Sequence, residues 1–262
     1  MGIINATSDS FSGDGLGVQG SIARGLALLD AGADMLDIGG ESTRPGARPV
    51  NSEEEIRRVE PVIVALSVRT GATLSVDTMK PAVARRAVAA GAAMWNDVTA
   101  LCFAADSADT AAELGCQVVL MHMQGTPRTM QIAPAYDDVV GEVLDFLARR
   151  TEAALAAGVR RSKVWLDPGI GFGKSVEHNL ALLADLPRLV ALGFPVLLGV
   201  SRKGFIRGLD AAATAAGDRL GGSLAAALAG ARAGVTAVRV HDVRETIQAL
   251  AVDHAIRSGR LG

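Results

Sequence analysis

Eight alternating strand and helix patterns predict that these 262 residues fold as one α/β domain, a (β/α)8 or TIM barrel spanning residues 1–262. Three observations favour this class. Single-domain α/β barrels commonly reach this length. Hydrophobic residues make up 49% of the chain, which is enough for a large core. Short apolar runs alternate with longer alanine-rich amphipathic stretches, which is typical of parallel strands joined by helices.

Each apolar run is rich in leucine or β-branched residues and ends in a polar residue, as a buried parallel strand would. An open doubly wound sheet is the alternative, but it usually needs only five or six strands. The predicted strands are residues 2–5, 35–38, 73–77, 94–97, 117–122, 164–167, 196–200 and 237–241.

Helical patterns between these strands carry matching end signals. Pro81 stands at a predicted helix start, where its missing N–H costs nothing. Ser52 and Glu55 have the spacing of a capping box. Glycines that follow helices and precede strands are expected to be left-handed C′ residues. The helices are predicted over 21–31, 53–69, 81–90, 137–157 and 222–233, and the glycines are Gly32, Gly91, Gly115, Gly158, Gly193 and Gly234.

Composition narrows the class of function. A net charge of -2 and an aromatic content of 3% argue against a nucleic-acid or membrane-surface partner. No window of about 18 residues is apolar without a charge or turn signal, and the start lacks the basic region of a secretory signal. Cys102 and Cys116 predict two buried thiols in a reducing compartment rather than a disulfide framework. We therefore expect a cytoplasmic protein.

Polar residues end all eight predicted strands, where the active site of this fold lies. Three long segments, 7–20, 40–51 and 122–135, follow strands and belong to the same rim. A merely solvated rim would favour Lys and Glu over inward carboxylates and amides. The strand-end residues are Asn5, Asp37, Asp77, Asn96 with Asp97, His122, Asp167, Ser201–Arg202–Lys203, and Arg239 with His241.

Two chemical groups stand out among the rim residues. The first offers two carboxylates and an amide, which suits a flat heterocycle with N–H donors and an acceptor edge. The second is cationic in a net-negative chain and predicts a site for phosphate or pyrophosphate. The first group is Asp77, Asn96 and Asp167, and the second is Lys203, Arg239, His241 and Arg44.

Two other motifs carry less weight. Residues 167–175 look like a P-loop, but Pro168 stands where the first glycine of that motif belongs. His122 and His241 could suggest zinc, but neither an H-x-x-x-H pair nor a cysteine cluster supports it.

Eight stretches together resemble the dihydropteroate synthase family of pterin-binding TIM barrels. They lie in the family's order and cover nearly the whole chain. They read MGIINATSDSFS (1–12), DIGGESTRPGA (37–47), SVDTMKP (75–81), NDV (96–98), LMHMQGTP (120–127), LDPGIGFGK (166–174), SRK (201–203) and RVHDV (239–243).

This resemblance implies a pterinylmethyl transferase of folate biosynthesis. The family joins 7,8-dihydropterin-6-ylmethyl diphosphate to p-aminobenzoate with Mg2+, is generally homodimeric and is the target of sulfonamides. It implies catalytic roles for Asp77, Lys203 and Arg239. The pterin site would comprise Asp77, Asn96, Asp167 and Lys203, with Met123 and Phe172 as further substrate contacts. The diphosphate site would comprise Asn5, Arg44, Arg239 and His241, and Asn5 would also be a metal ligand. The p-aminobenzoate site would comprise Thr43, Phe11 and Pro45.

The expected chemistry is electrostatic. Departure of diphosphate first would leave a cation at the pterin methylene. A carboxylate such as that of Asp77 at ~4 Å would stabilise this cation by ~4 kcal/mol at an effective dielectric constant of ~20. That stabilisation corresponds to roughly three powers of ten in rate. A neutral arylamine then attacks, so no strong general base is required.

Two positions depart from the family pattern. Ser8 stands where a proline is common, and Gly204 stands where a serine often meets the p-aminobenzoate carboxylate.

The sequence leaves two alternative functions open. A methyltransferase with a corrinoid partner generally lacks the full diphosphate set, and a non-catalytic pterin-binding paralogue predicts the loss of a strand-end residue.

Overall fold

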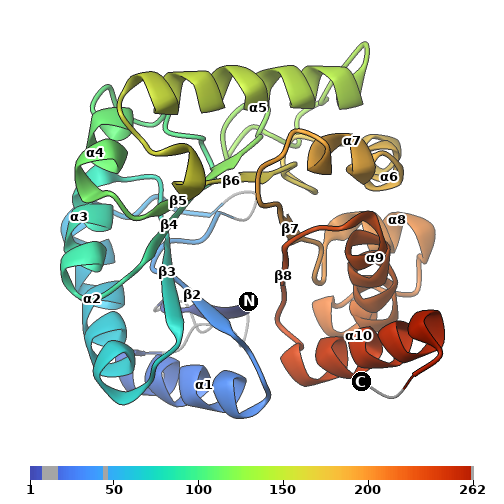
Figure 1. Ribbon diagram of the computed structural model, residues 1–262, viewed down its shortest axis with the longest axis horizontal. Coiled ribbons are helices and arrows are strands. Elements are labelled where there is room, and N and C mark those ends of the chain that lie inside the picture. Colours follow the sequence, from blue (N-terminus) through green and yellow to red (C-terminus); the bar gives the residue numbers. More distant parts are fainter. Residues whose placement is uncertain (8–16, 44–46, 261–262) are drawn as a thin grey trace.

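The structure is a computed structural model that describes residues 1–7, 17–43 and 47–260. The described residues form eight parallel strands with helices outside them (Figure 1). Strands β1 to β6 pair in sequence order, and β7 pairs with β8. The strands are β1 (Gly2–Asn5), β2 (Met35–Gly39), β3 (Thr73–Asp77), β4 (Met94–Asp97), β5 (Gln117–Met121), β6 (Val164–Asp167), β7 (Leu197–Gly199) and β8 (Ala237–Arg239).

Single parallel bridges join the two sheets into a barrel. Gly2 bridges Val240 between β1 and β8, and Leu166 bridges Val196 between β6 and β7. The Ile3 N–H donates to the Val240 carbonyl at 3.1 Å, which supports the first of these seams. The predicted (β/α)8 barrel is confirmed. An open doubly wound sheet does not fit, because that fold reverses its strand order.

Helices cover the outside of the strands, as Figure 1 shows. The predicted helices are confirmed to within three residues at their ends. The helices are α1 (Val18–Asp30), α2 (Ser52–Arg69), α3 (Pro81–Ala89), α4 (Ser107–Leu114), α5 (Val139–Ala156), α6 (Val176–Ala184), α7 (Leu186–Val190), α8 (Gly204–Leu209), α9 (Leu220–Ala233) and α10 (Val243–Ser258), with 3-10 turns η2 (Arg161–Lys163) and η3 (Ala216–Arg219).

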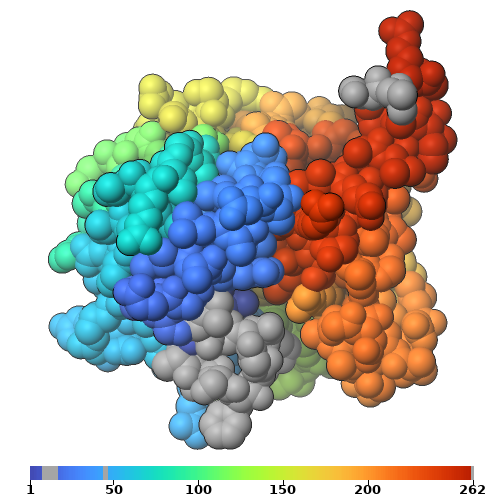
Figure 2. Space-filling view, turned by 90° about the horizontal axis from the view of Figure 1, so that it is seen from below, coloured from blue at the N-terminus to red at the C-terminus, as the bar shows by residue number. Residues whose placement is uncertain are grey.

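The end of α10 projects from the body of the molecule (Figure 2). No helix in the described ranges is long and apolar enough to cross a membrane.

Helix-end chemistry agrees with the sequence in most places. Pro81 occupies the first turn of α3. The six predicted C′ glycines all have positive φ, from 60° at Gly115 to 114° at Gly91. The predicted capping box at α2 is wrong. Asn51 is the N-cap and accepts from the Glu54 N–H at 2.8 Å, whereas Ser52 is already helical.

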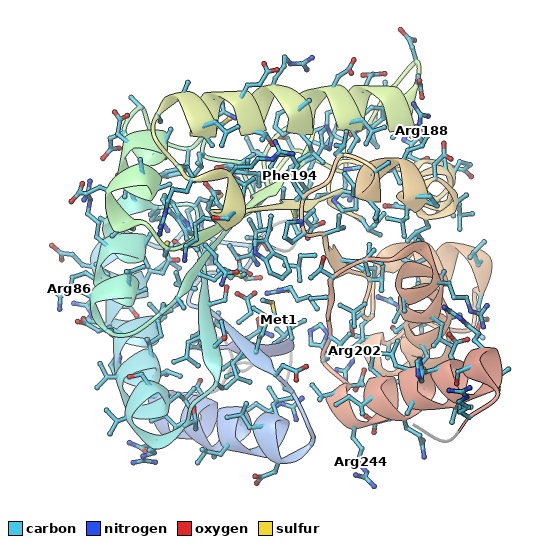
Figure 3. All side chains as sticks on the ribbon, viewed as in Figure 1. Met1, Arg86, Arg188, Phe194, Arg202 and Arg244 are labelled. Carbon is cyan, nitrogen blue, oxygen red and sulfur yellow. The ribbon has the colours of Figure 1, made fainter. Side chains whose placement is uncertain are left out.

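Apolar packing separates into two regions. The larger one lies between strands and helices and includes the fully buried Trp95, whose indole N–H donates to the Thr78 carbonyl at 2.7 Å. The smaller one contains Met1, Met94 and Leu197. Figure 3 shows Met1 inside the ring of strands. Cys116 is buried as expected, but Cys102 is exposed, so its predicted burial is wrong.

The end of the barrel opposite the strand-end residues contains a cavity of about 310 Å³. Met35 at the start of β2 and Ala237 at the start of β8 are among its lining residues, together with Trp165. None of the predicted site residues that the structure describes lines this cavity. The chemistry predicted from the sequence therefore belongs to the other end of the barrel.

Candidate active site

Strand register places three predicted site residues at one level of the rim. Asn5 pairs with Gly39, Gly39 with Asp77, and Asp77 with Asn96 across β1 to β4. Because these strands are parallel, the three polar residues reach the same end of the barrel. The shared level follows from the position of each polar residue at or near the end of its apolar run.

Arg239 lies between two carboxylates at this level. Its Nε donates to Asp37 Oδ2 at 2.5 Å, and its Nη2 donates to Asp77 Oδ2 at 2.8 Å. The Asn96 amide donates to the same Asp37 oxygen at 3.0 Å. Arg239, predicted as a member of the cationic group, therefore contacts a carboxylate of the first group, Asp77, so the two predicted groups meet at this residue.

Burial sets the electrostatics of this cluster. It raises the pKa of Asp77 above its usual range, and the Arg239 guanidinium opposes that shift. For Arg239 itself burial lowers the pKa, but Asp37 and Asp77 outweigh burial and leave it raised. Arg239 favours the ionised form of Asp77, whereas burial favours the neutral form. Asp37 Oδ1 and Asp77 Oδ1 are buried and have no hydrogen-bond partner among the described residues, so each oxygen can accept from a ligand N–H.

Asp37 belongs to this cluster, although the sequence patterns did not assign it to the substrate site. Its carboxylate is fully buried and contacts both Arg239 and Asn96. One feature of the sequence could have identified Asp37 as a site residue: it lies in the second predicted strand and is one of the polar residues of the rim.

Lys203 and Asp167 lie on the β6–β7 side of the rim. Lys203 Nζ is 4.2 Å from the centroid of the Phe172 ring, a cation–π contact. Burial lowers the pKa of Lys203 to about 8, and the charge of Asp167 acts against that shift. Asp167 Oδ1 accepts from the Gly169 N–H at 2.7 Å. The predicted contact residues Lys203 and Phe172 are thus brought together.

The glycine-rich stretch after β6 is shaped by close backbone approach. Gly169 has φ 67° and Gly173 has φ 62°. A Cβ at Gly169 would overlap the His122 carbonyl, and one at Gly173 would meet the Gln124 carbonyl at 2.5 Å. Packing against the segment after β5 therefore accounts for glycines that had suggested a P-loop.

The ends of β7 and β8 are tied together by side chains. Arg202 donates to both carboxylate oxygens of Asp242, at 2.6 and 3.0 Å. Ser201 Oγ lies 3.0 Å from His241 Nδ1. Figure 3 shows Arg202 beside β8. These contacts fix the segment that carries Lys203 relative to His241.

Several predicted residues make no side-chain hydrogen bond or ion pair with this cluster among the described residues. Asn5, Thr43 and Met123 are half-buried. Phe11, Arg44 and Pro45 lie outside the described residues, as does Ser8.

Metal binding by protein groups alone is not supported. Within residues 1–7, 17–43 and 47–260, no group of three or more His, Cys, Asp or Glu side chains could hold an ion. A single carboxamide at Asn5 fits a different arrangement, in which Mg2+ keeps waters and binds mainly to substrate phosphate oxygens.

Comparison with known proteins assigns the chain to a family. Residues 1–241 match the model of the pterin-binding enzymes. The chain therefore belongs to the family of pterin-binding enzymes.

Its relatives narrow this class. The dihydropteroate synthase of Escherichia coli K12 is 44% identical over 262 residues, covering 99% of this chain and 92% of that protein. The Yersinia pestis enzyme in complex with a sulfonamide drug has a TM-score of 0.94 and 43% identity, covering 98% of this chain and 94% of the other. The Xanthomonas albilineans enzyme with 7,8-dihydropteroate has a TM-score of 0.86 and 47% identity, covering 98% and 92%. Within its family the chain groups with the dihydropteroate synthases.

Proposed function

We propose that this chain carries out the dihydropteroate synthase reaction at the carboxyl ends of its strands. The reaction condenses 7,8-dihydropterin-6-ylmethyl diphosphate with p-aminobenzoate and gives 7,8-dihydropteroate and pyrophosphate. The observation that carries the proposal is the buried cluster of Asp37, Asp77, Asn96 and Arg239, with two carboxylate oxygens that lack partners among the described residues.

The pterin fits this cluster by hydrogen bonding. Carboxylates of Asp77 and Asp167 would accept from pterin N–H groups, and the Asn96 amide can both donate and accept. Lys203 would donate to the pterin carbonyl while its ammonium group lies over the Phe172 ring. Met123 and Phe172 would form apolar walls. Strand-end residues predicted for the pterin are all present, so a non-catalytic paralogue is not favoured, and the relatives give no support to the methyltransferase alternative.

Charge separation drives the reaction. The bond between the pterin methylene and the diphosphate oxygen breaks, and its electron pair leaves with pyrophosphate. Asp77 stabilises the methylene cation, since a fixed anion acts most strongly where charge develops. The amine nitrogen of p-aminobenzoate then forms the new C–N bond and loses its proton to solvent water. Three residues have catalytic roles in this scheme. Asp77 stabilises the cation, Lys203 binds the pterin, and Arg239 contacts Asp77 and the departing anion.

Diphosphate would be bound by Asn5, Arg44, Arg239 and His241. Mg2+ bound to the diphosphate and touched by Asn5 would neutralise charge on the leaving group. Thr43, Phe11 and Pro45 would lie near p-aminobenzoate.

Three wider expectations stay proposals. The chain would act as a homodimer in the cytoplasm, where the two free cysteines would stay reduced. It would also bind sulfonamides, as the Yersinia pestis relative does.

A coupled pyrophosphate assay tests the function. Wild-type protein should release pyrophosphate only when pterin diphosphate, p-aminobenzoate and Mg2+ are all present, with 7,8-dihydropteroate formed in equal amount. Calorimetric titration of pyrophosphate with and without Mg2+, on wild type and Asn5→Ala, tests the metal separately. Unchanged turnover after chelation by EDTA would remove Mg2+ from the proposal, and pyrophosphate release without p-aminobenzoate would contradict the transferase.

A further inference from the structure

Lys174 is a buried lysine that the proposed reaction does not use. It is 3% exposed and lies at the end of the β6 loop, residues 168–175. Its Nζ lies 2.9 Å from the Gly169 carbonyl oxygen, 3.0 Å from that of Phe172 and 2.9 Å from His122 Nδ1. The His122 carbonyl oxygen lies at 3.4 Å. An ammonium group has three N–H donors, which these closest three acceptors match.

No carboxylate lies within ion-pair distance of Lys174 in the described part of the chain. Its surroundings are neutral oxygen and nitrogen atoms, like those that hold a bound cation. Burying an ammonium without a counter-ion is unfavourable, and an apolar side chain would avoid that cost. The lysine therefore requires an explanation beyond filling space.

The position of Lys174 links two loops of the rim. His122 directly follows β5, whereas Gly169 and Phe172 belong to the β6 loop. Two other contacts join the same segments: Tyr136 donates to the Gly173 carbonyl at 2.7 Å, and Gln131 donates to the Gly171 carbonyl at 2.8 Å. Among the side chains of this set, Lys174 is buried, whereas Tyr136 is half-buried and Gln131 is exposed.

Phe172 connects these contacts between the two loops to the proposed pterin site. Its carbonyl accepts from Lys174, while its ring lies 4.2 Å from Lys203 Nζ. Fixing the Phe172 backbone therefore fixes the wall against which Lys203 packs. Lys174 influences this wall through backbone atoms.

We infer that Lys174 acts as an internal cation that holds the β6 loop in its pterin-binding conformation. It is a positioning residue, and this inference rests on the proposed pterin site.

The pKa of Lys174 sets the pH range in which it carries this charge. Burial lowers its pKa to about 7, while Asp167 raises it and Lys203 lowers it. Burial and the charge of Lys174 together lower the pKa of His122 to about 3. His122 is therefore neutral near pH 7, and its Nδ1 can accept from the ammonium when its proton is on Nε2.

Kinetics of Lys174→Met test the inference. The KM for pterin diphosphate should rise about tenfold or more, with the KM for p-aminobenzoate changed much less, because the β6 loop touches the pterin part of the site. Lys163→Met, just before the opposite end of β6, is the matched control and should behave as wild type. A folded Lys174→Met protein with unchanged pterin KM, or with both KM values raised equally, would overturn the inference.

Chemical rescue gives a second, independent measurement. Lys174→Ala should recover pterin binding with propylammonium, which replaces the missing methylenes and ammonium, and not with sodium at equal ionic strength. Calorimetry of pterin diphosphate binding, without p-aminobenzoate, keeps this test separate from turnover. If wild type binds the pterin but releases no pyrophosphate, the proposed reaction fails while the Lys174 inference stands or falls on the variants. Equal recovery with sodium would show a salt effect and overturn the internal-cation role.

Discussion

Cations on the two sides of this rim are held in different ways. On one side Arg239 contacts Asp37 at 2.5 Å and Asp77 at 2.8 Å. On the other side Lys203 lies against an aromatic ring and Lys174 against carbonyl oxygens and an imidazole. Neither lysine has a carboxylate within ion-pair distance among the described residues.

This difference separates a permanent charge from a responsive one. The pKa of Arg239 is raised, because its two carboxylates outweigh burial. Burial lowers the pKa of Lys203 to about 8 and that of Lys174 to about 7. Arg239 therefore stays charged at every physiological pH, whereas Lys203 and Lys174 can lose protons near neutrality. Burial also raises the pKa of Asp77, to about 7, against the effect of Arg239. An ionised Asp77 carboxylate suits the stabilisation of a cation that develops in the reaction.

Asp77→Asn is expected to have the largest effect, because it removes the negative charge of one of the two carboxylates that contact Arg239. The lost cation stabilisation of ~4 kcal/mol predicts a turnover reduced by roughly three powers of ten. Pterin affinity should fall much less, because the interaction acts mainly in the transition state. Steady-state kinetics and calorimetry give the two quantities, with Asp253→Asn, which weakens the partly exposed Arg232 contact, as control. Equal losses in affinity and rate would make Asp77 a binding residue only.

Lys80→Met tests whether a lysine on the carboxylate side behaves as an ion-paired group. Lys80 Nζ lies 2.5 Å from Glu41 and 2.5 Å from the fully buried Glu55. Removing it leaves Glu55 buried without its cation, which should cost about 3 kcal/mol of unfolding free energy. Urea unfolding measures this loss. Arg86→Met, which removes an ion pair that is more exposed, should cost less than about 1 kcal/mol. Similar losses in both variants would show that burial of the Lys80 cluster carries no special weight.

The pH dependence of stability tests the lysine side. The pKa of Lys174 falls from its usual 10.5 to about 7 in the folded state, so between these values the unfolded chain binds more protons. Stability from this group should therefore rise with pH through that window, by at most about 1.4 kcal/mol per pH unit. The unfolding free energy of wild type minus that of Lys174→Met, measured at pH 7, 8 and 9, should rise.

Arg86→Met is the reference for this series, since a guanidinium stays charged at these pH values. Its difference from wild type should stay flat. A flat difference for Lys174→Met as well would mean that Lys174 does not change its protonation between the folded and unfolded chain in this pH range.

Sequence patterns were sufficient to predict the barrel, because each strand is a short apolar run with a polar end. The fold itself brings those polar ends together at one rim. The contacts between side chains inside the site could not be predicted in this way. Arg239 is 202 residues from Asp37, and charge alone suggested an anion site for it. Asn51 and Ser52 can both cap a helix, and only backbone geometry selects Asn51. The partners of Lys174 include two backbone carbonyls, which side-chain patterns do not show.

The smallest effect is expected from Gly204→Ser, beside Lys203 on the lysine side. Gly204 is exposed, and a Cβ there would meet no atom within 4 Å, so a serine fits without strain. Family resemblance places a serine hydroxyl here near the p-aminobenzoate carboxylate. Because water competes at an exposed site, the added hydrogen bond should contribute only about 0.5–1.5 kcal/mol, a gain of roughly two- to tenfold in affinity. p-Aminobenzoate and a sulfonamide should tighten in parallel, while pterin binding stays unchanged.

Titrations of both aryl ligands against protein loaded with pyrophosphate and Mg2+ measure this change. Gly204→Ala is the matched control, because it adds the Cβ and restricts the backbone without supplying a hydroxyl. Serine and alanine variants with the same affinities would attribute any gain to the backbone. Unchanged affinity in both would place residue 204 outside the aryl site. If the hydroxyl tightens aryl ligands alone, the lysine side of the rim contains two separable functions: pterin binding through Lys203 and the Lys174-held loop, and aryl binding one residue further along the chain.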